Sequence, residues 1–270
     1  MSNPFYTDII RVIEEQVTAR GYTLVMQQIG TCDDEVKRGA MMEREKRLRG
    51  LILLGGRSDY TPQELAPLNI PYVCCSYDNQ YGTLPPDSYA SVSIADEEEA
   101  CRAVTELYRC GHRRIAALVS GTEDRSISQL RYQGYVRALA AHGLPLEQEL
   151  VIEAGSFDIR QSYLGHAAAS AGGGAVYRPV RHLRQHGHRG HAGFAGGRTA
   201  DPRGLLRHRH RRTDHLGLHQ PHPDHPLPAY GAHGRRSVEI LLDMVEHRGG
   251  PIRETAHTTL RTGESVRDIS

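Results

Sequence analysis

Apolar residues near the start of the chain recur with a helical period, at Ile9, Ile10, Ile13 and Val17, and Gly21 follows as a stop signal. This pattern predicts an amphipathic helix that ends near Gly21. Similar spacing predicts further helices over residues 33–48, 62–68, 96–110, 128–142 and 237–247.

Short apolar or β-branched runs separate these helices. They predict strands at residues 22–27, 51–54, 72–75 and 114–119. The continuous run at 51–54, ahead of two glycines, is typical of a strand buried on both faces. Alternating strands and helices predict an α/β fold with parallel sheets and crossover helices. Because ligands bind beyond the carboxyl ends of such strands, we expect a site in the loops after Leu54, Cys75 and Val119.

Residues 165–233 differ in composition from the rest of the chain. They contain no Glu, Ile, Lys, Met or Asn, and they hold 12 of the 16 histidines. No helical or strand period survives in this stretch, so we expect it to form no regular packed lobe. Metal binding is one interpretation of the histidines. Structural zinc sites, however, use defined spacings and usually cysteine, and this stretch has neither.

Charge and motifs exclude several other classes of function. The formal net charge of +1 does not favour nucleic-acid or membrane binding through bulk charge, and no apolar run is long enough to span a bilayer. The five cysteines form no CxxC pair, and the residues that follow Met1 do not resemble a secretory leader. We therefore expect free thiols and a cytoplasmic location. No catalytic or phosphate-binding motif occurs, so we expect neither an enzyme nor a cofactor.

Several segments resemble, in the right order, one family of bacterial transcription regulators, the lactose-repressor (LacI) family. The matching segments are Asn3-Pro4-Phe5-Tyr6, similar to NPFF; Arg49–Leu53, similar to VDGIIL; Ile70–Val73, similar to IPVV; Cys110–Ala116, similar to LGHRRIA; Arg131–Leu139, similar to R-x-x-GF-x-x-AL; and Gly143–Pro145, similar to GLP. The resemblance covers about residues 2 to 163 and resumes at Gly234. It implies a periplasmic-binding-protein-like fold of two similar α/β lobes, with a small-molecule effector in the cleft between them.

The resemblance also implies a division of the chain. An amino lobe takes residues 1–95, the first half of a carboxyl lobe takes 96–164, the anomalous stretch takes 165–233, and a family-like helix and tail take 234–270. Family members carry a helix-turn-helix headpiece and then the first strand of the amino lobe, and this sequence begins after both. We therefore expect an amino lobe without its first strand, with its sheet split at that place, and no operator binding by this chain alone.

A shifted reading frame explains the anomalous stretch better than metal binding does. When the codons permitted for Arg207 to Gln220 are shifted by one base, they allow Val-Ile-Gly-Ile-Asp, similar to the family's VIGFD strand. Val176 to His191 shifted in the same way allow Phe-Ala-Thr-Ser-Asp-Asn-Met, similar to the family's FAANDLM. We infer two compensating single-base changes, one near residues 163–166 and the other near Gly234.

The resemblance assigns five candidate effector-binding residues. Phe5 and Tyr6 match an aromatic pair that flanks the effector, and Tyr77 matches a cleft aromatic after the third strand. Arg131 matches an arginine that clamps a polar effector, since a guanidinium fork suits sugar hydroxyls or a carboxylate. Arg125 matches a second cleft arginine of purine-responsive members. The alternatives are a core aromatic for each ring and a solvated surface charge for each arginine.

The function that the sequence predicts is effector sensing by a cytoplasmic regulator, most simply a repressor. Its expected partners are a sugar or purine-like effector, a second copy of the chain, and operator DNA through a headpiece that this chain lacks. Helices 7–20 and 33–48 are expected to form the contact between subunits. The alternative is a sugar-binding protein of a transport system with the same fold, which CGHRRIA at Cys110–Ala116 does not favour.

Overall fold

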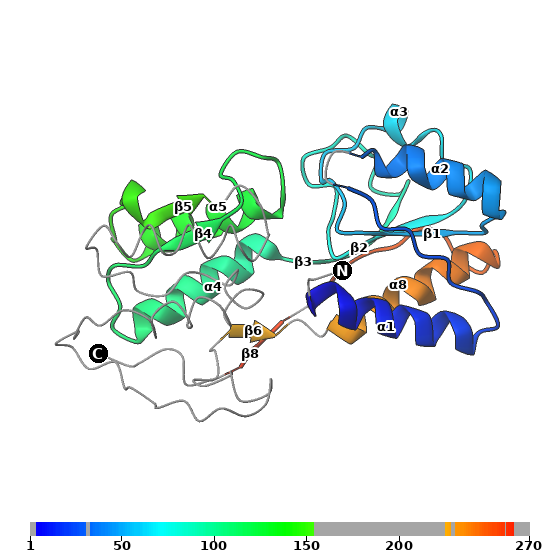
Figure 1. The fold of residues 1–270 in the computed structure, drawn as a ribbon. Coiled ribbons are helices and arrows are strands. Elements are labelled where there is room, and N and C mark those ends of the chain that lie inside the picture. Colours follow the sequence, from blue (N-terminus) through cyan, green and yellow to red (C-terminus); the bar gives the residue numbers. More distant parts are fainter. Residues whose placement is uncertain (1–3, 31–32, 154–224, 228–229, 257, 262–270) are drawn as a thin grey trace, which may run out of the picture. The chain divides into compact units, whose positions relative to one another are not determined.

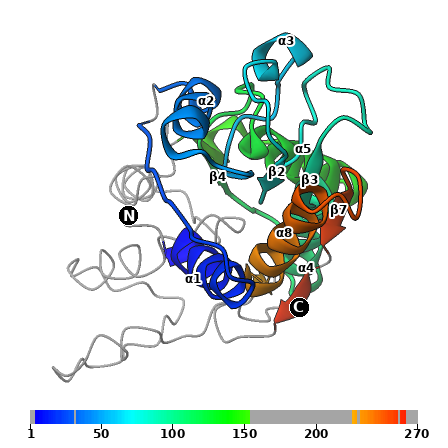
Figure 2. The same ribbon diagram turned by 90° about the vertical axis from the view of Figure 1, so that its right-hand side faces the viewer.

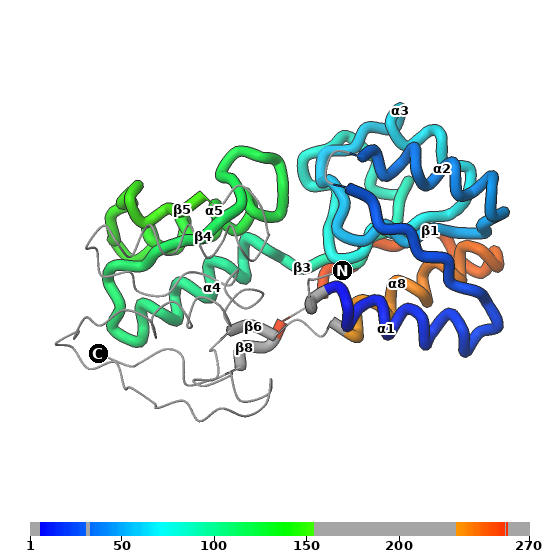
Figure 3. The backbone as a smooth tube through the Cα atoms, viewed as in Figure 1, coloured from blue at the N-terminus to red at the C-terminus, as the bar shows by residue number. Residues whose placement is uncertain are grey.

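The computed structural model describes residues 4–30, 33–153, 225–227, 230–256 and 258–261 (Figure 3). These residues divide between two units. The first unit takes its described residues from 1–99, 123–130 and 227–259, and the second takes them from 100–122, 131–226 and 260–270.

The first unit is built on a four-stranded parallel sheet with the order β1-β2-β3-β7. Figure 1 labels β1, β2 and β3, and Figure 2 labels β7 beside β3. The strands are β1 (Leu51–Leu54), β2 (Tyr72–Cys75), β3 (Ala90–Ile94) and β7 (Arg253–Ala256). In this register Leu53 lies opposite Cys74, and Cys75 lies opposite Val92. The residues of β3 are all buried, as expected for a central strand that is covered on both faces.

Helices cover both faces of this sheet (Figures 1 and 2). Helices α1 (Pro4–Ala19) and α8 (Tyr230–Val245) pack side by side on one face, and α2 (Glu35–Lys46) and α3 (Pro62–Leu65) lie over the other. The face under α1 and α8 holds a core cluster of Ile9, Ile13, Val17, Cys75, Val238 and Leu242. At Gly234 the two helices approach closely, because a Cβ there would lie 2.8 Å from the backbone oxygen of Ile9.

Two helices of the first unit, α2 and α3, begin at residues whose side chains cap them. The Asp34 side chain accepts hydrogen bonds from the backbone N–H groups of Val36 and Lys37, which caps α2. Thr61 and Glu64 form a capping box on α3, with a proline in its first turn. Such caps explain why the predicted helix starts are close to the observed ones.

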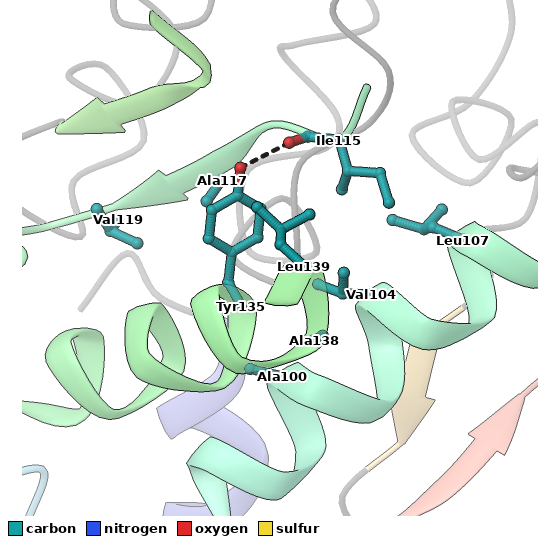
Figure 4. Close-up of a cluster of buried hydrophobic side chains, with 9 residues drawn as sticks. All are labelled: Ala100, Val104, Leu107, Ile115, Ala117, Val119, Tyr135, Ala138 and Leu139. Atoms are coloured by element: carbon teal, nitrogen blue, oxygen red, sulfur yellow. Dashed lines mark hydrogen bonds between the residues drawn. The ribbon is translucent and has the colours of Figure 1, made fainter. Parts of the chain in front are cut away.

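The second unit packs two helices on the same side of a short parallel pair of strands, β4 (Ala117–Val119) and β5 (Val151–Glu153). The helices are α4 (Asp96–Arg109) and α5 (Ile127–Ala141). The first residues of each helix belong to the first unit. Figure 4 shows their buried cluster, in which the Tyr135 hydroxyl donates a 2.8 Å hydrogen bond to the backbone oxygen of Ile115. A 3-10 turn, η1 (Gln148–Leu150), leads into β5. A separate two-stranded sheet pairs β6 (His225–Leu227) with β8 (Thr259–Arg261).

Most of the predicted elements are confirmed. Helices α1, α2, α4 and α5 and strands β1 and β2 lie where the sequence placed them, while α3 and β4 are shorter than predicted. Helix α8 begins at Tyr230, earlier than the predicted start at residue 237, and so includes the last residues of the anomalous stretch. Of the other residues in 165–233, only 225–227 are described, in β6, so the prediction for this stretch lies largely outside the described residues.

The predicted strand at residues 22–27 is wrong, because this segment forms no strand. The physical reason is that a strand needs a hydrogen-bonded neighbouring strand, and no strand in the described residues pairs with this segment. The predicted split of the sheet at the missing first strand stays a prediction, since β1 ends the strand order at that place. Strands β3 and β7, which the pattern did not predict, occupy the centre and the other edge of the sheet.

Candidate functional site

The loops after β1 and β2 lie together at the carboxyl edge of the first unit's sheet, as predicted for parallel strands. One side-chain amide joins them. The backbone N–H of Tyr60 donates to Asn79 Oδ1 at 2.6 Å, and Asn79 Nδ2 donates to the Tyr60 backbone oxygen at 2.9 Å. The backbone N–H of Tyr81 adds a 2.7 Å bond to the Ser58 oxygen. Because Tyr60 and Asn79 are buried, these bonds hold the two loops in a fixed relation.

Two consecutive glycines bring three polar side chains together at this edge. Gly55 has a φ of +74°, and a Cβ there would lie 2.3 Å from the hydroxyl oxygen of Tyr6 in the first turn of α1. A Cβ on Gly56 would lie 2.2 Å from Glu35 Oε1 and 2.5 Å from the Tyr77 hydroxyl oxygen. Only glycine gives both the backbone conformation at the first position and the space at the second. The glycine pair therefore permits Tyr6, Glu35 and Tyr77 to converge.

Glu35 and Tyr77 place ionisable groups below the surface of this edge. Glu35, in the first turn of α2, accepts hydrogen bonds from the Tyr60 hydroxyl and, at 3.4 Å, from the backbone N–H of Arg57. Burial raises the pKa of Glu35, and the hydrogen bond from Arg57 offsets only part of this effect. Tyr77 is 1% exposed, and its hydroxyl forms no hydrogen bond within the described part of the chain. Burial raises the pKa of Tyr77 as well, with added effects of Cys74 and Glu35.

A second polar cluster surrounds Asp78, directly after Tyr77. Its carboxylate accepts hydrogen bonds from the Tyr89 hydroxyl at 2.6 Å, the Ser91 hydroxyl at 3.0 Å and Arg253 Nη2 at 2.5 Å. The Arg253 guanidinium also lies 5.0 Å from the centroid of the Tyr89 ring. Burial raises the pKa of Asp78, but the hydrogen bonds from Arg253 and Tyr89 outweigh it, so the pKa lies below its ordinary value. Asp78 is therefore held as a carboxylate.

Beside Asp78 the first unit contains a cavity of about 110 Å³. Its lining residues, all from the first unit, are Ser58, Asp78, Gln80, Ile94, Ala95, Asp96, Glu97, Glu98, Ile127 and Leu130. Carboxyl groups from the first turn of α4 dominate the polar part of this lining. Such a lining favours hydroxyl groups or a positive charge and disfavours an anion. The cavity is smaller than a typical small-molecule site, so it has room for only part of a ligand.

The structure places the five predicted site residues in different surroundings. Tyr6 is half-buried at the glycine pair, and Tyr77 is buried beneath it, in the core. Phe5 belongs to the first turn of α1, but its side chain lies outside the described residues. Arg125 is exposed, with a φ of +50°. Arg131 is half-buried on α5, in the second unit. The structure thus brings Tyr6 and Tyr77 to one place, and the binding roles of all five remain predictions.

Sequence reasoning located the loops of this site but missed several of its polar residues. Glu35, Tyr60, Asp78 and Asn79 carry the hydrogen bonds described above, yet none belongs to a recognisable motif. Glu35 looks like one of many charges on a helix. The one usable signal was the polar pair Asp78-Asn79, which follows the end of a buried strand after two residues.

Within the described residues, no helix is both long and apolar enough to cross a membrane. In the same residues, no group of three or more His, Cys, Asp or Glu side chains is placed to hold a metal ion. The four cysteines that the structure describes are free thiols.

Residues 1–169 match the family described as periplasmic binding proteins and the sugar-binding domain of the LacI family. The chain belongs to this family. The match ends close to the start of the stretch with anomalous composition. The described sheets and helices agree with the fold of the family, in which parallel sheets are covered by helices.

Relatives in sequence agree with this assignment. The HTH-type transcriptional repressor CytR of Escherichia coli K12 is 28% identical over 165 residues, which are 59% of this chain and 47% of that protein. Catabolite control protein A of Priestia megaterium is 29% identical over 155 residues, 57% of this chain and 45% of that protein. Over these alignments the chain spans about half the length of each relative.

Two solved structures have the same fold. One is the complex of the transcriptional regulator CelR with cellobiose, with a TM-score of 0.72, 21% identity, and coverage of 98% of this chain and 80% of that one. The other is a LacI-type regulator from Bacillus cereus, with a TM-score of 0.75, 18% identity, and coverage of 99% and 94%.

Proposed function

We propose that this chain is the effector-sensing part of a bacterial LacI-type transcription regulator, most simply a repressor, and that its effector is a sugar or another small polar molecule such as a purine. The observation that carries the proposal is the family match over residues 1–169, and one similar protein, CytR, is a transcriptional repressor. The solved structures similar to this chain include one with cellobiose and one, from Enterococcus faecium, with ribose.

The carboxyl edge of the first unit supplies chemistry that suits such an effector. The half-buried ring of Tyr6 offers an apolar surface for the carbon face of a sugar or for a purine, and Phe5 is its expected partner. Carboxyl groups at the amino end of α4 offer hydrogen-bond acceptors to hydroxyl groups. Arg125 and Arg131 are proposed as the donors that clamp the polar side of the ligand.

Tyr77 acts differently in this proposal, because its ring is buried in the core. Its hydroxyl lies at Gly56, directly beneath the glycine pair, and lacks a hydrogen-bond partner in the described part of the chain. A bound ligand would reach it only through a small displacement of the loop that follows β1. We therefore assign to Tyr77 the support of this loop and a polar contact to the ligand through its hydroxyl group.

In the proposed regulator the effector changes the balance between two arrangements of the protein, and this balance sets the affinity of a headpiece for operator DNA. The regulator is proposed to be a cytoplasmic dimer that binds DNA only through that headpiece. Accordingly, the purified 270-residue chain is expected to leave an operator fragment unshifted in gel retardation at any salt concentration. Sequence-specific, salt-dependent retardation would contradict this assignment of roles.

The proposal is tested by calorimetry against a panel of sugars, nucleosides and purines. Two proteins are compared, the 270-residue chain as written and a version with residues 165–233 restored to the alternative frame and with a first strand added. We expect the restored version to bind a member of the panel with a Kd in the micromolar range, and the chain as written to bind at least about 100-fold more weakly, a difference of about 2.8 kcal/mol. Comparable tight binding by both would show that the frame inference is wrong.

Arginine variants then test the assigned site within the restored version. Replacing Arg131 by methionine is expected to weaken binding about tenfold or more, since it removes a charged donor but keeps a long apolar chain. The exposed Arg109, on α4, provides the matched control, and Arg109→Met should leave the Kd unchanged. Equal effects of the two substitutions would remove Arg131 from the site.

The second candidate function is that of a sugar-binding protein of a transporter, because the matched family includes periplasmic binding proteins. The similarity of the chain to the transcriptional repressor CytR favours the regulator. The DNA directly upstream of the codon for Met1 decides between the two. An in-frame helix-turn-helix would establish the regulator, and a signal peptide would establish the transporter.

A further inference from the structure

The carboxyl group of Glu35 lies against the loop that follows β1, residues 55–60, and has no basic partner there. It accepts hydrogen bonds from the Tyr60 hydroxyl and, at 3.4 Å, from the backbone N–H of Arg57. The guanidinium group of Arg57 instead lies 2.8 Å from Asp59 and 3.1 Å from Glu64. In the described part of the chain, no Lys, Arg or His side chain forms an ion pair with Glu35. A negative charge on Glu35 is therefore held by neutral donors and not by a salt bridge.

The loop backbone covers the Tyr77 hydroxyl as well as Glu35. A Cβ built on Gly56 would lie 2.2 Å from Glu35 Oε1 and 2.5 Å from the Tyr77 oxygen, so the same loop residue packs against both side chains. Tyr77 is 1% exposed, and its hydroxyl forms no hydrogen bond to the residues that the structure describes. A buried polar group without a partner is unfavourable. The loop in this position thus covers a hydroxyl that lacks a partner and a carboxyl group that lacks a counter-ion.

The charged and titratable groups around Glu35 come from every element that packs against it. They are Asp34 at the start of α2, Cys74 in β2, Tyr77 after β2, Arg57 and Tyr60 in the loop, and Tyr6 of α1 at the neighbouring Gly55. Burial is the largest cause of the raised pKa of Glu35. The backbone N–H and the charge of Arg57 oppose this rise, and the negative charge of Asp34 adds to it.

The neighbours of Glu35 whose pKa values are shifted keep their charge over the range in which Glu35 titrates. A hydrogen bond from the Lys37 backbone N–H is the largest cause of the lowered pKa of Asp34, so Asp34 is ionised above about pH 4. Burial raises the pKa of Cys74 to about 12 and raises that of Tyr77 as well, so both groups stay neutral. Between about pH 4 and 7, the charge that changes beneath the loop is therefore that of Glu35.

We propose that Glu35 is a positioning residue that controls the loop after β1 through its own proton: the neutral acid keeps the loop closed over Tyr77, and the carboxylate releases it. The physical reason is that an open loop exposes the carboxylate to water, which stabilises its charge, whereas the neutral acid gains little from water. An open loop also uncovers the Tyr77 hydroxyl. Higher pH should therefore favour a ligand that contacts Tyr77. The inference rests on the proposed function, since this loop borders the proposed effector site.

Hydrogen exchange at the Arg57 amide tests the loop directly, in the 270-residue chain and without a ligand. Each rate is divided by that of an unstructured peptide at the same pH, which gives the protection of the amide. We expect this protection to fall at least about fivefold between pH 4 and pH 7. In Glu35→Gln, whose side chain has the same size but cannot ionise, it should not change with pH. Glu45, an exposed carboxyl group on the same helix, provides the matched control, and Glu45→Gln should behave like the parent.

Urea separates a local opening of the loop from unfolding of the first unit. Exchange that requires unfolding accelerates with urea in proportion to the surface that becomes exposed, whereas a local opening responds little. At pH 7 the Arg57 amide should therefore be insensitive to low urea concentrations. The Ser76 amide, which donates to the Val92 oxygen at 2.8 Å, should exchange faster under the same conditions. This comparison uses the parent chain, so it is informative even if Glu35→Gln does not fold.

The proposal is supported if Arg57 loses protection with pH in the parent and in Glu45→Gln, keeps it in Glu35→Gln, and does not respond to urea. Protection that is unchanged in the parent, an equal loss in Glu35→Gln, or equal acceleration of Arg57 and Ser76 by urea each overturns it. No ligand takes part in these measurements. Failure of the loop control therefore appears in hydrogen exchange, and failure of the proposed function appears in the calorimetry described above.

Discussion

Replacing Asp78 by alanine should destabilise the first unit more than any other single change at the candidate site. The Asp78 side chain is 8% exposed and accepts bonds from Tyr89, Ser91 and Arg253. Arg253 comes from β7, whereas Asp78 follows β2, so the pair connects distant strands of the sheet. Alanine removes the only negative charge in this set and leaves three donors facing a cavity.

The size of the effect follows from what each donor loses. Removing one partner of a fully buried ion pair costs about 3–5 kcal/mol. The Arg253 side chain is 35% exposed, so water replaces part of its lost interaction and the value must be reduced. The Tyr89 hydroxyl, in a buried residue, loses a hydrogen bond worth about 1 kcal/mol. We expect Asp78→Ala to lower the free energy of unfolding of the first unit by about 3 kcal/mol.

The same cluster sets a pH dependence. Because the folded pKa of Asp78 is lowered, its carboxylate contributes stability above its ordinary pKa of about 4. This contribution is lost as the pH falls through the lowered folded pKa. The difference in stability between the chain and its Asp78→Asn variant should therefore be constant from about pH 5 to 7 and shrink below about pH 4.

Native-state hydrogen exchange measures this effect unit by unit, which is necessary because a chain of two units need not unfold in one step. The Ser76 amide, which donates to the Val92 oxygen at 2.8 Å, reports on the first unit, and Leu118 in β4 reports on the second. Tyr89→Phe is the matched control, with an expected loss of about 1 kcal/mol. A loss below about 0.5 kcal/mol for Asp78→Ala, or equal losses at Ser76 and Leu118, would refute the reasoning.

Four other substitutions test separate parts of the structure. Tyr135→Phe removes a buried 2.8 Å hydrogen bond and should destabilise the second unit by about 1 kcal/mol in hydrogen exchange, with no change in the first. Gly55→Ala imposes a side chain at positive φ against Tyr6 and should cost more than about 1 kcal/mol; a fully stable variant would show that the contact is loose. Burial raises the pKa of Glu35, so ionisation of its carboxyl group opposes folding. The chain should therefore lose stability relative to its Glu35→Gln variant as the pH rises from about 4 to 7. Parallel curves of stability against pH for the two proteins would contradict this. Met41 is 48% exposed on α2, a helix that is proposed for the contact between subunits. Met41→Lys should weaken self-association of the chain, measured by sedimentation. A variant that dimerises as strongly as the parent would exclude the Met41 side of α2 from the contact.

The sequence determined the elements whose signals are local. Strand β1 was predicted with its exact bounds because four consecutive apolar residues end at two glycines, which no helix of useful length accommodates. Helix α4 was predicted from its amphipathic period, and its cluster of acidic residues at the start suits the amino end of a helix. These features depend on residues a few positions apart, so the chain alone defines them.

Tertiary structure decided the elements that need a distant partner. The sequence of strand β3 (ASVSI) has only a weak strand pattern, yet every residue of β3 is buried. The strand forms because β2 and β7 pair with it on both sides and so place it inside the sheet. Tyr22–Gln27 shows the converse. It has the stronger strand pattern but forms no strand, since no strand pairs with it in the described residues.

The candidate site, too, was predicted in part by the sequence and decided in part by the tertiary structure. The parallel topology let the sequence predict that the loops after β1 and β2 share one edge. It could not predict that Glu35 and Tyr77 meet at Gly56, or that Arg253 reaches Asp78 across 175 positions of the chain. A strand's own residues define its tendency to extend, whereas the side chains that converge beyond its end are brought together by packing of the helices and strands around it.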